Sequence, residues 1–238
     1  MEDNKTQNLE SSIEKLAVAL DFADEKEAMK FVGLMEDRIK IYKVGLELFS
    51  VSGPQFVSKL IGLGYDVFVD LKLHDIPNTV YGAAKALGKL GARFITAHSS
   101  GGVEMLQAAN EGFNEGCSDG GWGGLRYCLG VSVLTSDPYF TDQLLFSRVE
   151  TIVTAGLKGL VCSGTDLSKL TQKIGHLFKV VPGVRPVGSF ENDQLRVTTP
   201  SNAIASGADL LVVGRPITLS SNPIAATNEI LRSIFLAN

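Results

Sequence analysis

Residues 66–80, DVFVDLKLHDIPNTV, contain Asp70, Lys72 and Asp75 at a spacing that could support acid–base chemistry. The apolar run VFV predicts a strand buried on both faces, with Asp70 and Lys72 two positions apart at its end. Side chains two apart on a strand project to the same side, so these two are expected to face each other. Pro77 ends the strand and places Asp75 on the turn that follows. A lysine flanked by two acids stays protonated, because nearby opposite charges favour its charged form.

A helix is expected directly after this turn. Asn78 or Thr79 can cap its N-terminus, and apolar residues recur at helical spacing from Val80 to Leu90 until Gly91 stops it. A surface salt bridge is the alternative interpretation of D-x-K-x-x-D taken alone. The apolar run before it and the Pro-Asn-Thr after it place the set at a strand's carboxyl end instead, where α/β proteins put their chemistry.

Short apolar runs alternate with segments of helical periodicity along the whole chain, which predicts an α/β protein with a parallel sheet. Eight such units in 238 residues favour a closed (β/α)8 TIM barrel, with a doubly wound sheet as the alternative. We expect a flexible polar N-terminus over 1–12 and a single barrel domain over 13–238. The expected strands are 16–20, 41–44, 67–71, 94–97, 127–134, 160–162, 178–181 and 210–213.

Composition excludes several classes of function. With 45% apolar residues, 20% charged residues and a formal net charge of −4, the chain has no basic footprint for nucleic acid or an anionic membrane. Its longest apolar runs are strand-sized, which predicts no transmembrane helix, and its polar first ten residues exclude a secretory signal. Three cysteines without C-x-x-C spacing indicate reduced thiols, with neither a metal site nor a disulfide framework. A soluble cytoplasmic enzyme is expected.

A glycine-rich stretch at 112–124, GFNEGCSDGGWGG, invites comparison with a phosphate-binding loop. It lacks the G-K-[ST] ending of such loops and precedes the fifth strand, at the structural face of a barrel. We interpret it as a long turn.

In a barrel the active site is built from the residues that end the strands. Here two acids and two lysines on the first three strands face an edge rich in arginine and glycine on the seventh and eighth. Barrels frequently bind phosphate at that second edge, and arginine offers a fork of donors. The polar segment 185–200 could close over a ligand, with Gln194 reaching its phosphate, although an ordinary surface loop is the alternative. The strand-end candidates are Asp21, Lys43, Asp70, Lys72, Thr135, Pro182, Arg185, Gly214 and Arg215.

These motifs resemble the orotidine 5′-phosphate decarboxylase family over nearly the whole chain, from LAVALDF to VVGRPIT. The resemblance rests on K-V-G, D-x-K-x-x-D-I-P-N-T, P-G-V-R, D-Q-x-R-V-x-T-P and V-x-G-R-x-I-T. The chain departs from the family pattern at Glu191-Asn192, where a small residue and Gly are frequent, and at Leu195, which replaces a frequent basic residue. Both departures lie in the polar segment 185–200 that could close over a ligand, and they concern the dynamics of that closure. The length resembles that of the stand-alone, bacterial-type form.

The resemblance implies a carboxy-lyase that converts orotidine 5′-monophosphate to UMP and CO2 without a cofactor, in the last step of pyrimidine biosynthesis. Lys72 would protonate C6 of the pyrimidine as CO2 leaves, with Asp70 beside the substrate carboxylate. Asp21 and Lys43 would bind ribose hydroxyls, and Lys43 would also hold the acidic array together. An electrostatic mechanism follows, because the electrons left on C6 have no obvious sink.

Further contacts and a homodimer are implied by the same resemblance. Thr135 would read the pyrimidine amide, and Pro182 would line the ring. Asp75 and Thr79 would enter the site of the neighbouring subunit. The phosphate would be bound by Arg185, Gln194, Gly214 and Arg215.

Two alternatives remain open. A sugar-phosphate decarboxylase or aldolase of the same barrel superfamily shares D-x-K-x-x-D but uses Mg²⁺, held partly by a glutamate where this chain has Lys43. A cation at a metal site would be self-defeating. A barrel that only binds a nucleotide phosphate is the other alternative, but binding alone does not require Lys72 between two acids. No metal site is expected, because the three histidines, His74, His98 and His176, share no ligand spacing.

Overall fold

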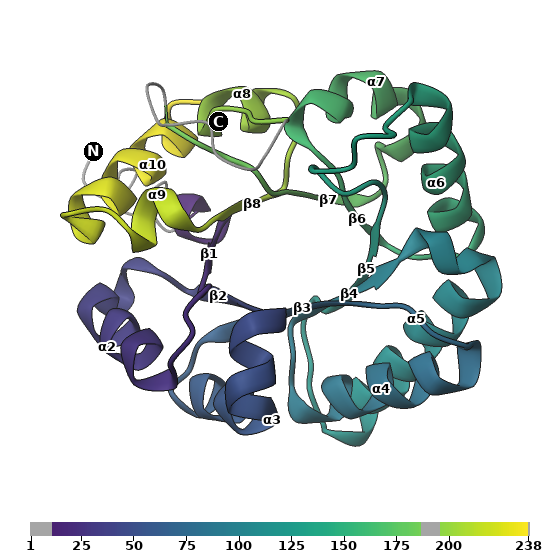
Figure 1. The fold of residues 1–238 in the computed structure, drawn as a ribbon, viewed down its shortest axis with the longest axis horizontal. Helices are drawn as coiled ribbons and strands as arrows, with labels where there is room; N and C mark the ends of the chain where they lie inside the picture. The colour runs from purple at the N-terminus through teal and green to yellow at the C-terminus, as the bar shows by residue number, and fades with distance from the viewer. Residues whose placement is uncertain (1–10, 187–195, 238) are drawn as a thin grey trace.

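The computed structural model describes residues 11–186 and 196–237, and over these ranges the chain forms a closed parallel barrel. The strands follow one another around it in chain order, and the last pairs back onto the first (Figure 1). The predicted (β/α)8 barrel is therefore confirmed, and a doubly wound sheet is excluded. The strands are β1 Leu16–Ala19, β2 Ile41–Gly45, β3 Asp66–Leu73, β4 Phe94–His98, β5 Tyr127–Val131, β6 Gly159–Val161, β7 Phe178–Val181 and β8 Leu210–Val213.

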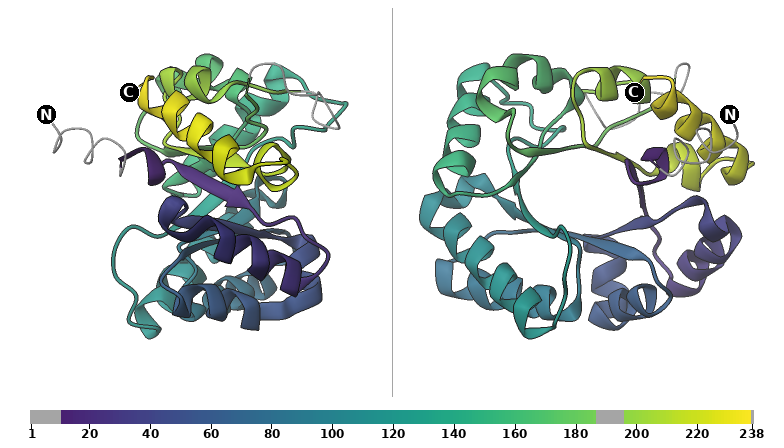
Figure 2. Two further views of the ribbon diagram at one scale, coloured as in Figure 1. Left: turned by 90° about the vertical axis from the view of Figure 1, so that its left-hand side faces the viewer. Right: turned by 180° about the vertical axis from the view of Figure 1, so that it is seen from behind.

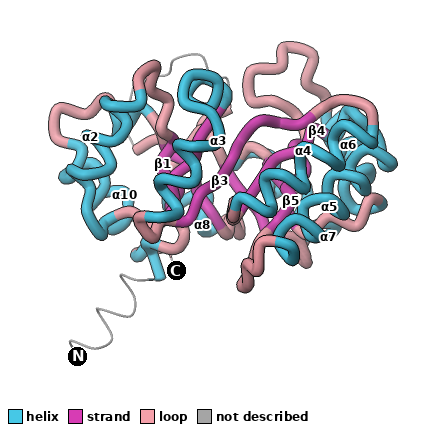
Figure 3. Tube along the Cα trace, turned by 90° about the horizontal axis from the view of Figure 1, so that it is seen from below, coloured by secondary structure: helices cyan, strands magenta, loops and turns pink. Residues whose placement is uncertain are grey.

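Helices surround the strands on the outside, as the views from the side and from behind (Figure 2) and from below (Figure 3) show. Each packs one apolar stripe against the barrel, which is the expected solution for an amphipathic helix. Two 3₁₀ turns, Glu36–Arg38 and Ser99–Gly101, lie among them. The helices are α2 Glu25–Met35, α3 Leu46–Gly62, α4 Pro77–Leu90, α5 Gly102–Asp119, α6 Asp142–Thr154, α7 Gly164–Ile174, α8 Pro200–Ala205, α9 Arg215–Thr218 and α10 Pro223–Phe235.

Several expected element ends differ from the observed ones, and the differences at β5 and α4 have a clear physical reason. β5 stops at Val131 rather than at residue 134, because Ser132 places its backbone N–H and its hydroxyl on the carbonyl of Val161 and the chain then turns. The predicted cap at Asn78 or Thr79 is wrong, since α4 begins at Pro77 with no side-chain cap. Proline at the first helical position has a suitable φ and no N–H that needs a cap.

The interpretation of 112–124 as a long turn is wrong for its first part, because α5 continues to Asp119. The glycines there allow α4 and α5 to pack closely. A Cβ at Gly112 would lie 2.3 Å from the carbonyl oxygen of Tyr81, and one at Gly116 would lie 2.1 Å from that of Lys85. The turn itself is confined to the residues after α5.

The interior of the barrel is filled largely by aromatic side chains near its amino-terminal end. The Phe94 ring stacks at 5.5 Å on Phe178 and at 6.2 Å on Tyr127, and Phe68 meets Phe94 edge-on. A second apolar layer lies between the strands and the helices. The three cysteines are buried free thiols, as predicted. Within the described ranges, no helix is both long and apolar enough to cross a membrane.

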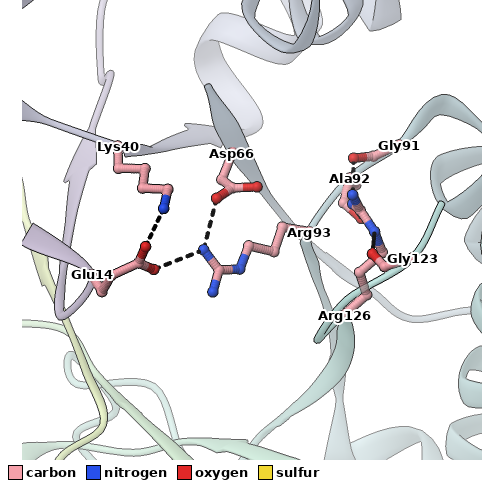
Figure 4. A network of polar contacts seen from close by, with 8 residues as sticks. All are labelled: Glu14, Lys40, Asp66, Gly91, Ala92, Arg93, Gly123 and Arg126. Atoms are coloured by element: carbon pink, nitrogen blue, oxygen red, sulfur yellow. Dashed lines mark hydrogen bonds and ion pairs between the residues drawn. The ribbon is translucent and has the colours of Figure 1, made fainter. Parts of the chain in front are cut away.

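A polar network joins the amino ends of the first four strands (Figure 4). Glu14 forms ion pairs with Lys40 and with Arg93, whose Nη1 lies 3.3 Å from a Glu14 carboxylate oxygen. The same Nη1 lies 2.7 Å from an Asp66 oxygen. Arg126 donates to the carbonyls of the turn after α4 and extends the polar contacts toward β5. This end of the barrel is therefore closed by charge pairs over a packed aromatic interior.

Candidate active site

A cavity of about 240 Å³ opens at the opposite end, among the carboxyl ends of the strands. Its floor is apolar and includes Phe68, Val131, Val161 and Val212. All nine residues predicted from strand ends come together around it, although they come from six different strand ends. Those that line the cavity are Asp21, Lys43, Asp70, Lys72, Thr135, Pro182, Arg185, Gly214 and Arg215.

Four charged side chains form a continuous chain along one side of the cavity. Lys72 Nζ lies 2.9 and 3.0 Å from the two carboxylate oxygens of Asp70. Lys43 Nζ lies 3.8 Å from Asp70 Oδ2 and 3.1 Å from Asp21 Oδ1. Gly45 leaves room for this arrangement, since a Cβ there would meet Lys43 Nζ at 2.9 Å. The order acid, lysine, acid, lysine places each charge beside its opposite.

Asp70 contacts both lysines of this chain, and its side chain is only 14% exposed. Burial alone raises the pKa of its carboxyl, but the charges of Lys43 and Lys72 and hydrogen bonds from Lys72 and Thr96 outweigh it. The net effect lowers the pKa of Asp70. Asp70 is therefore an anion at neutral pH, with two ammonium groups in place around it.

The strand that carries Asp70 and Lys72 is irregular at this point. Val69 pairs with Ile95, but the next pairing joins Leu73 to Ala97, so β3 contains a bulge opposite Thr96. Lys72 has φ 51°, a left-handed conformation that is unfavourable for a residue with a Cβ. Bulges re-aim side chains and are common next to active sites. The expected Asp70–Lys72 contact is thus present, but the backbone between them departs from a regular strand.

Thr96 is part of the site and was missed by the sequence analysis. Its hydroxyl accepts a hydrogen bond from the Lys72 N–H at 2.8 Å and donates one to Asp70 Oδ1 at 2.9 Å. It is 1% exposed. A signal was available, because Thr96 is two positions after Phe94 and so points into the barrel, where a polar side chain needs a partner.

The opposite edge of the cavity gathers hydrogen-bond donors. Arg185 follows β7, is 8% exposed, and its Nε has no hydrogen-bond partner among the described residues. Its backbone N–H donates to the carbonyl of Thr198 at 2.9 Å, which fixes the start of the loop. Gly214 lies close to β1, where a Cβ would be 3.3 Å from Asp21 Oδ2. With Arg215 beside them, these residues form a cationic edge that faces the acid–lysine chain.

An ion pair that the sequence analysis also missed ties the neighbouring loops together. Arg196 Nη1 lies 2.7 Å from the buried Asp166 carboxylate at the start of α7. Its Nη2 donates to the carbonyl of Leu134 at 2.8 Å, and its guanidinium lies 4.0 Å from the centre of the Phe140 ring. The loop that carries Thr135 is therefore attached to the segment that begins at Arg196.

Two predicted site residues, Asp75 and Thr79, do not line the cavity in this structure. Asp75 and Thr79 are exposed on and after the turn that follows β3, and Asp75 accepts a hydrogen bond from the N–H of Ile76 at 2.6 Å. Gln194 lies outside the described residues, as do Glu191, Asn192 and Leu195.

The histidines are not arranged as metal ligands. His98 accepts a hydrogen bond from the Ser100 N–H at 3.2 Å, and its ring stacks on His74 at 5.9 Å. In the part of the chain that the structure describes, no cluster of three or more His, Cys, Asp or Glu residues could hold a metal ion.

Comparison with known proteins finds the same assignment for sequence and for structure. The family model described as "Orotidine 5′-phosphate decarboxylase / HUMPS family" matches residues 14–230. An orotidine 5′-phosphate decarboxylase of Vibrio cholerae is 42% identical over 92% of this chain and 98% of its own length, and one of Pseudoalteromonas translucida is 40% identical over 92% and 97%. The crystal structure of orotidine 5′-phosphate decarboxylase from Lactobacillus acidophilus superimposes with a TM-score of 0.79 at 34% identity, covering 93% of this chain and 99% of that one.

Proposed function

The chain belongs to the orotidine 5′-phosphate decarboxylase / HUMPS family, and we propose that it converts orotidine 5′-monophosphate to UMP and CO2, the last step of UMP biosynthesis. The observation that carries this proposal is the position of Lys72, hydrogen-bonded to both oxygens of Asp70 at the mouth of a cavity whose far edge is cationic. An ammonium donor and a phosphate-binding edge are what this substrate requires at its two ends.

The proposed reaction is a replacement of the carboxylate on C6 by a proton. The bond from C6 to the carboxylate carbon breaks, CO2 leaves, and the electron pair remains on C6. Lys72 Nζ gives a proton to that carbon and regains one from solvent. Asp70, held as an anion, lies beside the substrate carboxylate and keeps Lys72 oriented. Charges already in place stabilise the developing carbanion without the reorganisation that water would need.

The other cavity residues are assigned to the remaining parts of the substrate. Asp21 and Lys43, 3.1 Å apart, are placed to bind the ribose hydroxyls. Thr135 would read the pyrimidine amide, and Pro182 would line the ring; both residues border the cavity. These assignments divide the cavity into a ribose side, on β1 and β2, and a base side, on β5 and β7.

We assign the phosphate to the cationic edge formed by Arg185, Gly214 and Arg215, with Gln194 joining from the loop. The buried Nε of Arg185, which has no partner among the described residues, supports an anionic ligand there, because a buried donor needs an acceptor. Binding energy from a remote phosphate can be expressed at the reacting carbon, provided that it strengthens in the transition state.

The reaction is proposed to need no metal ion. Lys43 hydrogen-bonds Asp21 and lies near Asp70, so a divalent cation placed between these carboxylates would meet an ammonium group. The alternative, a sugar-phosphate enzyme that holds Mg²⁺ at this position, is less compatible with that arrangement. Turnover should survive prolonged treatment with EDTA. Loss of turnover on chelation, with recovery on Mg²⁺, would favour the alternative.

We further propose a homodimer in which Asp75 and Thr79 complete the neighbour's site. Residues His74 to Thr79 form an exposed stretch beside the cavity mouth, and the apolar Ile76 is 65% exposed within it. An isologous two-fold interface would carry each such stretch to the partner reciprocally. The buried free thiols are typical of a reducing compartment and support a cytoplasmic location.

A direct assay tests the reaction. Orotidine 5′-monophosphate is added to the purified protein, and the loss of orotate absorbance is followed together with the appearance of UMP. The proposal expects turnover with added substrate alone. Failure of a folded protein to consume this substrate, with or without Mg²⁺, would reject it.

A further inference from the structure

Thr96 lies behind the cavity, where its hydroxyl can only act on neighbouring residues. It lies on β4, is 1% exposed, and does not line the cavity, so it has no route to the substrate. Its hydroxyl nevertheless contacts both Asp70 and Lys72, which do line the cavity. A residue in this place can affect the reaction only through those two neighbours.

The backbone of β3 makes a hydroxyl necessary opposite the bulge. Between the pairs Val69–Ile95 and Leu73–Ala97, β3 uses more residues than β4, so the regular ladder is interrupted. Lys72 sits there with φ 51°, and its N–H points to the Thr96 hydroxyl rather than to a strand carbonyl. A buried N–H that lacked this acceptor would be left unpaired.

The same hydroxyl has only one proton to give. Because it accepts from the Lys72 N–H through a lone pair, its proton is available for Asp70 Oδ1, 2.9 Å away. The hydroxyl thus links the backbone of one catalytic residue to the carboxylate of the other. Asp70 is fixed from one side by Lys72 Nζ and from another by Thr96.

We propose that Thr96 is a positioning residue of the decarboxylation reaction, which holds the left-handed backbone of Lys72 and the carboxylate of Asp70 in one geometry. This inference rests on the proposed function of the site. Loss of the hydroxyl would release both partners while leaving the cavity lining and the cationic edge intact. The consequence is a lower kcat with little change in KM, since ground-state binding does not involve Thr96.

Thr96→Val and Thr96→Ser separate the hydroxyl from the shape of the side chain. Valine keeps the volume and removes both hydrogen bonds, whereas serine keeps the hydroxyl. In Thr96→Val we expect kcat to fall by about ten- to a hundredfold, as for a slightly misplaced catalytic group, with KM within about threefold of wild type. In Thr96→Ser we expect kcat to return to within about threefold of wild type, because the link is restored.

Thr227→Val is the matched control. Thr227 lies on α10, is fully buried, and its hydroxyl has no hydrogen-bond partner among the described residues. The same chemical change there should leave kcat and KM unchanged. If Thr96→Val does not fold, Thr96→Ala is measured by the same criteria, since it removes the hydroxyl with less demand on packing.

The outcomes are distinguishable from those of the proposed function. Wild-type turnover in the same assay tests the reaction itself. With an active wild type, a folded Thr96→Val or Thr96→Ala enzyme with kcat within threefold of wild type would overturn the positioning role. A Thr96→Ser enzyme as impaired as Thr96→Val would also overturn it, because the methyl group and not the hydroxyl would then matter.

Discussion

The two ends of the barrel carry the same alternation of positive and negative side chains, but the packing and the strand geometry around these side chains differ. At the amino end the order is Lys40, Glu14, Arg93, Asp66, and at the carboxyl end it is Asp21, Lys43, Asp70, Lys72. Four side chains at the amino ends of the first four strands form one chain of contacts, and four at the carboxyl ends of the first three strands form the other. The charges alone therefore do not distinguish a structural network from a reactive one.

The surroundings make the distinction. The amino-end network covers a barrel interior filled by the stacked rings of Phe94, Tyr127 and Phe178. The hollow that Glu14 and Lys40 border is lined by none of these rings and does not open into the barrel interior. At the carboxyl end the charges border a cavity, and the strand beneath them is bulged, with Lys72 in a left-handed conformation. Regular strand ends carry the network at the amino end, and an irregular strand holds the proposed catalytic pair at the carboxyl end.

The largest contrast is expected from removing one lysine at each end. Lys72→Ala should lower kcat by at least about 10²- to 10⁴-fold, the range for loss of a general acid, in a protein that remains folded. Lys40→Ala removes an exposed lysine from the corresponding chain of alternating charges at the amino end, and it should leave kcat and KM unchanged. Steady-state kinetics and circular dichroism of both variants check this. Near-wild-type turnover by Lys72→Ala would show that Lys72 is not the proton donor.

The next effect concerns the far edge of the cavity. Arg215→Ala should lower kcat/KM by about 30- to 5,000-fold, the cost of truncating one partner of a buried charge contact. Orotidine, which lacks the phosphate, should be a very poor substrate for the wild type and should lose little further in Arg215→Ala. Competition kinetics with the two substrates tests this. Equal kcat/KM for orotidine and its monophosphate would show that the edge does not bind phosphate.

A hybrid-dimer experiment sharpens the comparison, because the carboxyl end is proposed to be shared between subunits. Lys72→Ala and Asp75→Asn chains, each nearly inactive alone, are mixed in equal amounts and allowed to exchange. In each hybrid dimer one site collects both changes and the other collects neither. Random pairing makes about half of the dimers hybrids, so about a quarter of all sites should recover full activity. If hybrids form and no activity returns, Asp75 acts in its own subunit.

The smallest effect is expected at the amino end. Burial alone raises the pKa of Glu14, but its contacts with Lys40 and Arg93 outweigh burial and lower it. A carboxylate with a lowered folded pKa stabilises the protein above its unfolded pKa, and this contribution is lost as the pH falls through the folded pKa. The free energy of unfolding of Glu14→Gln should therefore be lower than that of wild type at neutral pH, by about 0 to 1 kcal/mol for a partly exposed network, and equal to it in acid. Denaturant titrations at both pH values check this, and kcat should not change.

Local patterns in the sequence predicted much of this architecture. The apolar runs located all eight strands, and Gly91 marked the end of α4. Asp70 and Lys72 were placed together because they share one strand end. The glycines at 112 and 116 were misread, because their reason is the close approach of α4, which a local pattern does not contain.

Contacts between distant strands were not predictable in the same way. Thr96 meets Lys72 only because β3 bulges, and a bulge depends on the register of two strands. Arg196 reaches Asp166 across 30 positions, and Arg93 reaches Glu14 across 79. Such pairs are fixed by closure of the barrel, so residue type and spacing cannot specify them.

The central claim is that the carboxyl end, and not its counterpart, holds the nucleotide with its reacting carbon at Lys72. A crystal structure with UMP bound tests it most directly. We expect the phosphate to contact Arg185 and Arg215, and C6 of the base to lie about 3 to 3.5 Å from Lys72 Nζ, the separation of reacting atoms. A nucleotide bound elsewhere, or one whose C6 faces away from Lys72 while the phosphate is in place, would contradict the account.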